Sequence, residues 1–212
     1  MKYKMITFCD QIAVSEYNLP NTLAKVKLKD YEEIAITSEL LSSFGYECKS
    51  TELVKCCIQL VGDKWWVTPL KTNYGCYKRI EKQYRIKEGE TVFIGEHYLT
   101  YVKNEGDSAQ CYLRYMEHTD EVIVNYKEGK TYRIGRKFVM KKTEIEDRAL
   151  STMHCQIEYI DGKLYIDDGG MVEGTFKPSS NGTWIKLEQK TVVLPSIVTL
   201  MLSAGTYLLL KS

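Results

Sequence analysis

The chain repeats one pattern of apolar and polar residues about a hundred positions later. Lys55–Leu60 and Gly62–Val67 run parallel to His154–Tyr159 and Asp161–Ile166 at an offset of 99 residues. A repeat of this size indicates two copies of one structural unit, each of which has to bury its own core. The chain is therefore constrained to two similar domains.

Flanking positions extend the repeat over most of the chain. Upstream, four positions match at an offset of 98: Val26, Leu28, Ile34 and Ile36 against Val124, Tyr126, Tyr132 and Ile134. Downstream, three match beyond a longer excursion of the second copy around Gly169–Pro178: Ile86, Val92 and Ile94 against Leu194, Leu200 and Leu202. We expect domains at residues 1–103 and 109–212, joined by Asn104–Ser108 as a short polar linker.

Each copy consists of short runs rich in Val, Ile, Tyr, Phe and Leu, separated by turn-forming clusters at about ten-residue spacing, which is typical of a β-sandwich or barrel. The fold class is predicted as all-β. Asp161-Gly162 and Glu88-Gly89 are expected to close hairpins. The best helical segment, Thr37–Phe44, is short and is followed by Gly45. The expected strands include Thr22–Leu28, Cys57–Val61, Trp65–Thr68, Thr91–Ile94, Val122–Tyr126, Cys155–Ile160, Lys163–Ile166, Thr183–Leu187 and Thr199–Leu202.

Charge and cysteine usage limit the classes of partner and compartment. With 29 basic and 28 acidic residues the net charge is +1, so no global field attracts nucleic acid or an anionic membrane. The N-terminus lacks the apolar core of a signal peptide, and no run approaches the ~20 apolar residues of a membrane span. The seven cysteines show no CxxC spacing and are interpreted as reduced structural thiols. We expect an intracellular protein, nuclear or cytoplasmic, with no cofactor and no metal.

Three short polar clusters of the second copy fall in loops between strand-like runs. They are Gly135-Arg136, Ser151–His154 and Ser180–Thr183. Together they supply a permanent cation, hydroxyl groups and a side-chain amide. A phosphorylated side chain carries about two negative charges near neutral pH and needs a fixed cation with neutral donors around it. The clusters therefore favour a site for a phosphate and for the peptide backbone that carries it.

The second copy resembles a forkhead-associated (FHA) domain. The residues that carry this resemblance are Tyr132–Arg136, Ser151–His154 with Ile157, Ser180–Ile185, and the ladder Leu194, Leu200, Leu202. The resemblance implies a β-sandwich that reads phosphothreonine, and hence a phosphothreonine-dependent protein–protein interaction module rather than an enzyme. Its partner would be a phosphothreonine-containing protein.

The resemblance also implies a role for each residue of the phosphopeptide site. Arg136 would be the cation, since its guanidinium stays charged and its fork matches two phosphate oxygens. Ser151 would donate its hydroxyl to the phosphate, which Ser180 is also placed to touch. Asn181 would hydrogen-bond the peptide backbone on either side of the phosphothreonine.

Other residues of the site are expected to modulate or support it. Thr152 stands where family members often carry Arg or Lys, and its backbone N–H or hydroxyl would contribute instead, with Lys141 or Lys142 as candidates to restore the missing charge. His154 is expected to brace the loop that carries Ser151. Gly135 and Gly182 occupy positions where a side chain or an ordinary φ would be unwelcome. The excursion Gly169–Pro178 is a candidate to shape specificity.

The first copy is expected to keep the fold without the site. It has Thr37-Ser38 where the second copy has Gly135-Arg136, and Glu52–Lys55 and Tyr74-Gly75 at the positions of the other two clusters. The cation, the hydroxyl and the amide are therefore all replaced. The first domain is predicted to be a degenerate FHA-like domain with a structural or docking role.

Other functional classes have to be weighed beside phosphothreonine binding. The missing basic residue after Ser151 favours a phosphate-independent scaffold subunit of a larger assembly. A pair of nucleic-acid-binding β-domains is disfavoured by the near-neutral charge. Catalysis by Ser151 and His154 is disfavoured because their spacing does not place the imidazole on the hydroxyl and no acidic partner is evident. His97 and His118 lack ligand neighbours and are interpreted as plain surface or strand residues.

Overall fold

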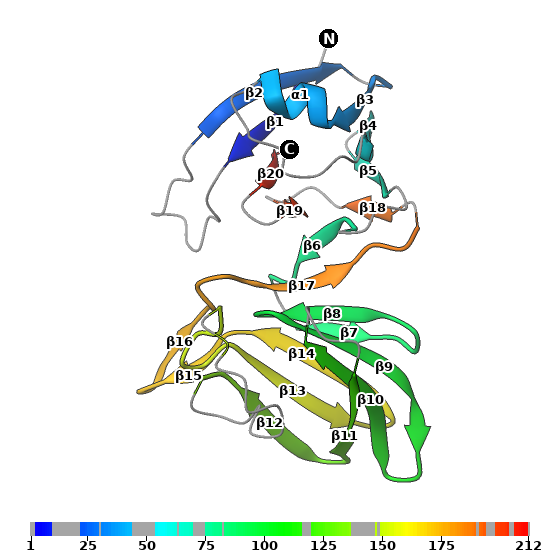
Figure 1. The fold of residues 1–212 in the computed structure, drawn as a ribbon, viewed down its shortest axis with the longest axis vertical. Coiled ribbons are helices and arrows are strands. Elements are labelled where there is room, and N and C mark those ends of the chain that lie inside the picture. The colour runs from blue at the N-terminus through cyan, green and yellow to red at the C-terminus, as the bar shows by residue number, and fades with distance from the viewer. Residues whose placement is uncertain are drawn as a thin grey trace. The chain divides into compact units, whose positions relative to one another are not determined.

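The chain folds almost entirely into β-strands, which confirms the predicted all-β class (Figure 1). The structure is a computed structural model that describes residues 3–9, 22–29, 31–43, 54–62, 64–69, 75–81, 83–115, 120–136, 147, 149–189, 191–193, 198–203 and 206–211. A short helix, α1 (Ser38–Ser43), lies within the predicted helical segment, and Leu40 N donates a hydrogen bond to the capping Thr37 hydroxyl (3.0 Å). Within these ranges, no helix has the length and apolar character to cross a membrane.

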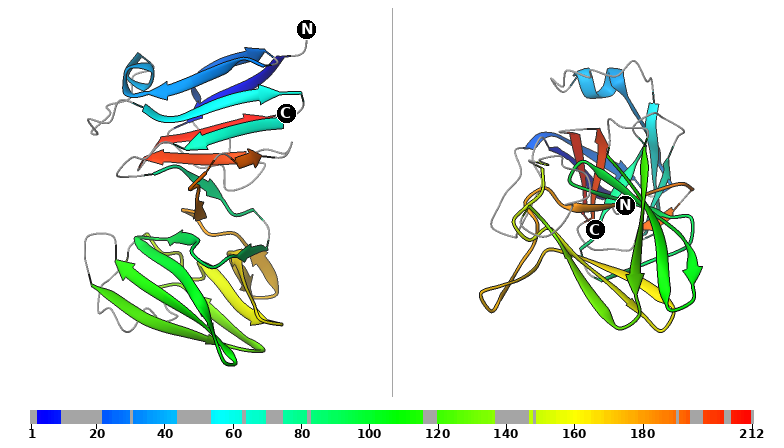
Figure 2. Two further views of the ribbon diagram at one scale, coloured as in Figure 1. Left: turned by 90° about the vertical axis from the view of Figure 1, so that its right-hand side faces the viewer. Right: turned by 60° about the horizontal axis from the view of Figure 1, so that its bottom comes forward.

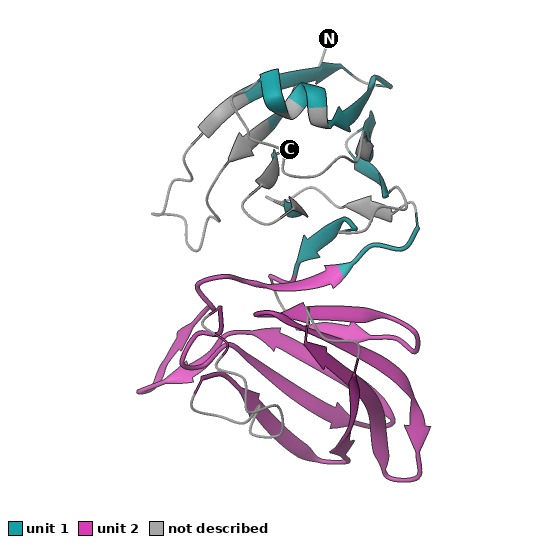
Figure 3. Cartoon of the chain, viewed as in Figure 1, with its two compact units in different colours: residues 1–79, 186–212 teal, residues 80–185 magenta. Residues whose placement is uncertain are grey.

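The strands form two compact units, each with its own core (Figure 3). Unit 1 comprises residues 1–79 and 186–212, and unit 2 comprises residues 80–185. These bounds differ from the predicted domains 1–103 and 109–212. The predicted linker Asn104–Ser108 lies within unit 2, where it is the turn of a hairpin in which Glu105 pairs with Ser108.

Unit 2 is built from two antiparallel sheets that enclose one core. The first has the order β11 (Glu121–Lys127), β10 (Ser108–Tyr115), β9 (His97–Glu105), β8 (Thr91–Ile94) and β17 (Thr183–Lys186). The second has the order β12 (Lys130–Ile134), β13 (Cys155–Ile160), β14 (Lys163–Asp168) and β7 (Tyr84–Ile86). Figure 2 shows both layers from two further directions. Strand alternation buries Val92 and Leu99 from one sheet against Ile157 and Leu164 from the other.

Unit 1 has the same two-sheet construction. Its first sheet has the order β2 (Thr22–Lys29), β1 (Tyr3–Cys9), β20 (Thr206–Lys211), β19 (Val198–Ser203) and β6 (Tyr77–Arg79). Its second has the order β3 (Glu33–Thr37), β4 (Val54–Val61), β5 (Lys64–Pro69) and β18 (Thr191–Val193). Trp65 is fully buried in the core between them, together with Ile6, Ile58 and Leu200.

The two units share one strand order but are closed by different parts of the chain. In unit 1 the strands β18, β19 and β20 come from the C-terminal end, whereas in unit 2 the corresponding places are taken by β7, β8 and β9, which precede β10. The last of the closing strands occupies the same place in each unit: β20 pairs with β1 in unit 1, and β9 pairs with β10 in unit 2.

Turn chemistry places the remaining connections of unit 2. Asp161 and Gly162, with φ of 51° and 68°, close the predicted hairpin between β13 and β14. Glu88-Gly89 does not close a hairpin, because its turn joins β7 and β8, which belong to different sheets. The excursion Gly169–Pro178 forms a separate hairpin of β15 (Gly170–Val172) and β16 (Thr175–Lys177).

Candidate functional site

Two of the three motif clusters are brought together by the pairing of neighbouring strands. Gly135-Arg136 directly follows β12, Ser151–His154 directly precedes β13, and β12 pairs antiparallel with β13. Backbone hydrogen bonds extend this pairing past the end of β12 and the start of β13: His154 N donates to Ile134 O (2.7 Å), and Arg136 N donates to Ser151 O (3.0 Å). The expected cation and the expected hydroxyl therefore start from adjacent backbone positions.

Gly135 allows this close approach. A Cβ atom at this position would lie 2.3 Å from Thr152 O and 2.9 Å from Ser151 O, both of which are backbone atoms. Any side chain would therefore push the Ser151 loop away from the end of β12.

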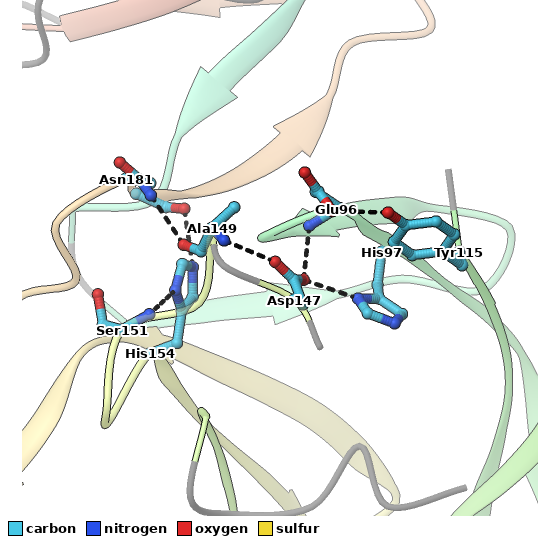
Figure 4. A network of polar contacts seen from close by, with 9 residues as sticks. Glu96, His97, Tyr115, Asp147, Ala149, Ser151, His154 and Asn181 are labelled. Atoms are coloured by element: carbon cyan, nitrogen blue, oxygen red, sulfur yellow. Dashed lines mark hydrogen bonds and ion pairs between the residues drawn. The ribbon is translucent and has the colours of Figure 1, made fainter. Parts of the chain in front are cut away.

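His154 links the second cluster to the third. Its side chain is completely buried, and Ser151 N donates a hydrogen bond to its Nδ1 (3.1 Å). Nε2 therefore carries the proton of the neutral ring and donates to Gly182 O at 3.0 Å. Figure 4 shows His154 with its donor residue Ser151. Because Nδ1 faces the Ser151 backbone rather than the hydroxyl, the geometry is that of a brace and not of a nucleophile with its base.

The substitution His154→Ala is expected to lower the free energy of unfolding by about 2–4 kcal/mol, because it removes one buried and one part-buried hydrogen bond and leaves a cavity. The loop that carries Ser151 would lose its brace, so phosphopeptide affinity should fall as well. Thermal and urea unfolding of the full chain check the expectation. A melt identical to that of the parent would point to a direct ligand contact instead.

The third cluster adds an amide and further donors to the same place. Ser180 N donates to the Ser151 hydroxyl (2.9 Å), and Asn181 Nδ2 donates to Ala149 O (2.8 Å). A hydroxyl that accepts one bond still has its own proton to donate, and an amide that donates one N–H keeps a second N–H and its carbonyl oxygen. Ser151 thus keeps a donor, and Asn181 keeps a donor and an acceptor, for a ligand.

The charged part of the site is more exposed than its frame. Arg136 and Thr152 lie at the surface, as do Ser180 and Asn181, whereas Gly135, His154 and Gly182 are buried. Gly182 has φ of 77°, and a Cβ there would lie 3.0 Å from the Trp184 ring. Lys141 and Lys142, the candidates for a second cation, lie outside the described residues.

Sequence reasoning missed two buried carboxylates next to these loops. Asp168, at the end of β14, accepts hydrogen bonds from the hydroxyls of Ser179 and Thr183, and so fixes both ends of the Asn181 loop. Asp147 accepts bonds from His97 Nδ1 (3.0 Å), Glu96 N (2.9 Å) and Ala149 N (2.8 Å). His97 is interpreted from the sequence as a plain surface or strand residue. It is the first residue of strand β9, and its side chain is completely buried.

Asp147 is expected to make stability depend on acidity. Burial disfavours its charged form, but the hydrogen bonds from the His97 ring and two backbone N–H groups outweigh burial, and the pKa of Asp147 lies below its ordinary value. The ionised carboxylate therefore contributes stability above the unfolded pKa, and this contribution is lost as the pH falls through the lowered folded pKa. In Asp147→Asn, melting temperatures should fall less steeply as the pH is lowered below about 4, the ordinary pKa of an aspartate. Parallel pH profiles for variant and parent would contradict this expectation.

The β15–β16 hairpin projects next to the site. At its base Gly169 N donates to His154 O (2.7 Å), and a Cβ at Gly170 would collide with the Met153 side chain. Met171 and Phe176 are paired across the two strands and are 56% and 55% exposed. The hairpin therefore presents an apolar pair beside the polar loops.

Thiols and metal ligands offer no competing site among the residues that the structure describes. Cys56, Cys57, Cys76, Cys111 and Cys155 are free, and burial raises the pKa of Cys111 to about 12, which disfavours a reactive thiolate. No group of three His, Cys, Asp or Glu side chains in the described ranges could hold a metal ion.

The fold and the loops define the class of protein: an all-β protein in which polar loops, one of them carrying Arg136, lie close together. Residues 132–208 match the FHA domain family, whose members are protein-interaction domains that bind phosphothreonine-containing proteins. The match begins in unit 2 and continues beyond Ile185 into the strands that close unit 1. No curated protein and no solved structure matches the chain.

Proposed function

We propose that the chain is a phosphothreonine-dependent protein–protein interaction module whose site lies in the loops of unit 2. The observation that carries this proposal is the convergence of the three motif clusters. Ser151 receives a backbone hydrogen bond from Arg136 N through its carbonyl and another from Ser180 N through its hydroxyl. The family match over residues 132–208 supports the same interpretation.

The chemistry of the site follows from the groups that stay available. Arg136 supplies the permanent positive charge that a dianionic phosphate requires, and its exposure leaves the guanidinium accessible to a peptide. Ser151 donates its hydroxyl to a phosphate oxygen, assisted by Thr152 and Ser180. Asn181 exchanges its contact with Ala149 O, or adds to it, to bond the peptide backbone. The apolar pair on the β15–β16 hairpin contacts peptide residues that flank the phosphothreonine.

We further infer that the chain contains two diverged copies of one FHA-like unit and that these copies exchange their closing strands. The common strand order of the two units supports this, as does the family match that runs from unit 2 into the strands closing unit 1. The first copy has no equivalent of the cation: at the place of Gly135-Arg136, Thr37 caps α1. Unit 1 therefore serves as a structural or docking part.

The alternative is a scaffold subunit of a larger assembly that binds without phosphate. The exposed Thr152 favours this alternative, because it presents no charge at a position next to the site. The two functions differ in their dependence on the phosphate group, which makes them separable by experiment.

The decisive experiment is a fluorescence-anisotropy screen of the full chain against a degenerate phosphothreonine peptide library. Unphosphorylated and phosphoserine libraries serve as controls. We expect binding only to the phosphothreonine library, with the flanking preferences reporting on the hairpin. Equal binding to all three libraries, or binding to none, would support the scaffold alternative.

A further inference from the structure

A second set of buried polar contacts lies behind the phosphopeptide loops and begins at His97. The side chains of His97 and Asp147 are 0% and 1% exposed, and Nδ1 of the ring lies 3.0 Å from Oδ2 of the carboxylate. A carboxylate can only accept from a ring nitrogen in this pair, so Nδ1 carries the proton that His97 donates. Figure 4 shows the pair beside the site.

Asp147 joins the β8–β9 turn to the loop that leads to Ser151. The oxygen that receives the His97 bond also receives Glu96 N (2.9 Å), and the other oxygen receives Ala149 N (2.8 Å). The turn approaches so closely that a Cβ at Gly95 would lie 2.4 Å from the carboxylate. Tyr115 fixes the turn from the other side by donating its hydroxyl proton to Glu96 (2.7 Å).

The same loop then contacts the residues expected to bind the peptide. Ala149 O accepts the Asn181 amide (2.8 Å), and the Ser151 hydroxyl accepts Ser180 N (2.9 Å). A continuous series of hydrogen bonds therefore runs from His97 through Asp147 and Ala149 to Asn181 (Figure 4). A shift of Asp147 would move the acceptor that orients Asn181.

The His97 ring does not serve packing alone. Its Nε2 is buried and has no hydrogen-bond partner among the residues that the structure describes, which costs free energy that an apolar side chain would not incur. The group that offsets this cost is Nδ1–H, through its bond to the buried carboxylate. Position 97 thus requires a hydrogen-bond donor. The acceptor of this bond is the Asp147 carboxylate, which also holds the loop that leads to Ser151.

We propose that His97 is a positioning residue for the phosphopeptide site, acting through Asp147 to orient the loop that carries Ser151 and receives Asn181. The inference rests on the proposed function of that site. Its consequence is that the β8–β9 turn supports the binding site directly and is not only part of the core.

Three variants of the full chain test the proposal. His97→Leu removes the donor, His97→Asn retains an N–H group near the position of Nδ1, and Leu99→Ala is a matched control that destabilises the core from the same strand. Affinity is measured with a phosphothreonine peptide selected from the library, at a temperature where all variants are folded. We expect His97→Leu to weaken binding about tenfold, as loss of a bond to a charged group does. His97→Asn and Leu99→Ala should bind like the parent.

Parental affinity in His97→Leu, or an equal loss in Leu99→Ala, would overturn the proposal. Amide hydrogen exchange in the free protein gives a second readout that needs no ligand. His97→Leu should accelerate exchange at Ala149 and Ser180 more than Leu99→Ala does, and equal acceleration would contradict the positioning role. If the parent binds no phosphothreonine peptide, the proposed function fails, while the exchange data still decide whether His97 orders the loop.

Discussion

Replacing Arg136 with alanine is expected to lower the affinity for a phosphothreonine peptide about 50-fold, because a charge-assisted, two-pronged contact with the phosphate is lost. The fold should be unaffected. Arg136 is exposed. Its hydrogen bond to Ser151 O comes from its backbone N–H, which alanine retains. Surface substitutions of this kind change unfolding free energies by about 0.5 kcal/mol or less. Fluorescence anisotropy and a thermal melt of the same sample measure both quantities.

Arg133→Ala is the matched control for this substitution. Arg133 lies on the preceding strand β12 and is also exposed, and its replacement removes the same unit of charge. We expect this variant to bind the peptide nearly as the parent does. An equal loss in both variants would show that the peptide responds to general charge, and full affinity in Arg136→Ala would place the phosphate elsewhere.

A disulfide between β7 and β14 is expected to form in the full chain when Arg85 and Tyr165 are both replaced by cysteine. The two residues are direct partners in the antiparallel pair, and such partners have Cα atoms about 4.5–5.5 Å apart, within the range a disulfide spans. Mild oxidation at low protein concentration should give nearly complete intramolecular linkage. Peptide mapping by mass spectrometry distinguishes this link from any that involves the native cysteines.

The control pair for strand exchange is Arg85→Cys with Trp66→Cys. Trp66 is the repeat equivalent of Tyr165 at the offset of 99 residues, so it would face Arg85 if each copy were closed by its own strands. In the structure Trp66 instead pairs with Val192 of β18. We therefore expect no disulfide between the two cysteines introduced in the control pair. Efficient linkage of the control pair, or linkage of the β7–β14 pair only between separate chains, would contradict exchange within the chain.

Much of the local structure could be predicted because strand alternation and turn residues act over short distances. Cys155–Ile160 is a strand with the predicted bounds, and Asp161-Gly162 closes its hairpin. The neighbourhood of Arg136 and Ser151 follows from the same local pairing of β12 and β13. The roles of the site residues as phosphate ligands stay predictions.

The contacts that support the site could not be predicted because their partners are distant in sequence. His97 and Asp147 are separated by 50 positions, and neither lies in a motif. In the sequence, His97 lies in an apolar run and Asp147 in a polar one. Two residues exposed at the surface would give the same pattern. Their burial together is visible only when β9 lies beside the loop before Ser151.

The sequence alone determined that this chain is all-β, that its apolar pattern repeats, and where the polar loops lie. Which strands close each sandwich was decided by the tertiary structure, because residues 86–94 and 194–202 carry the same apolar pattern in the sequence. The connection through Gly106-Asp107 gives a physical reason for the observed choice. So short a turn costs little loop-closure entropy, so β9 pairs with the next strand, β10, rather than with the distant β1.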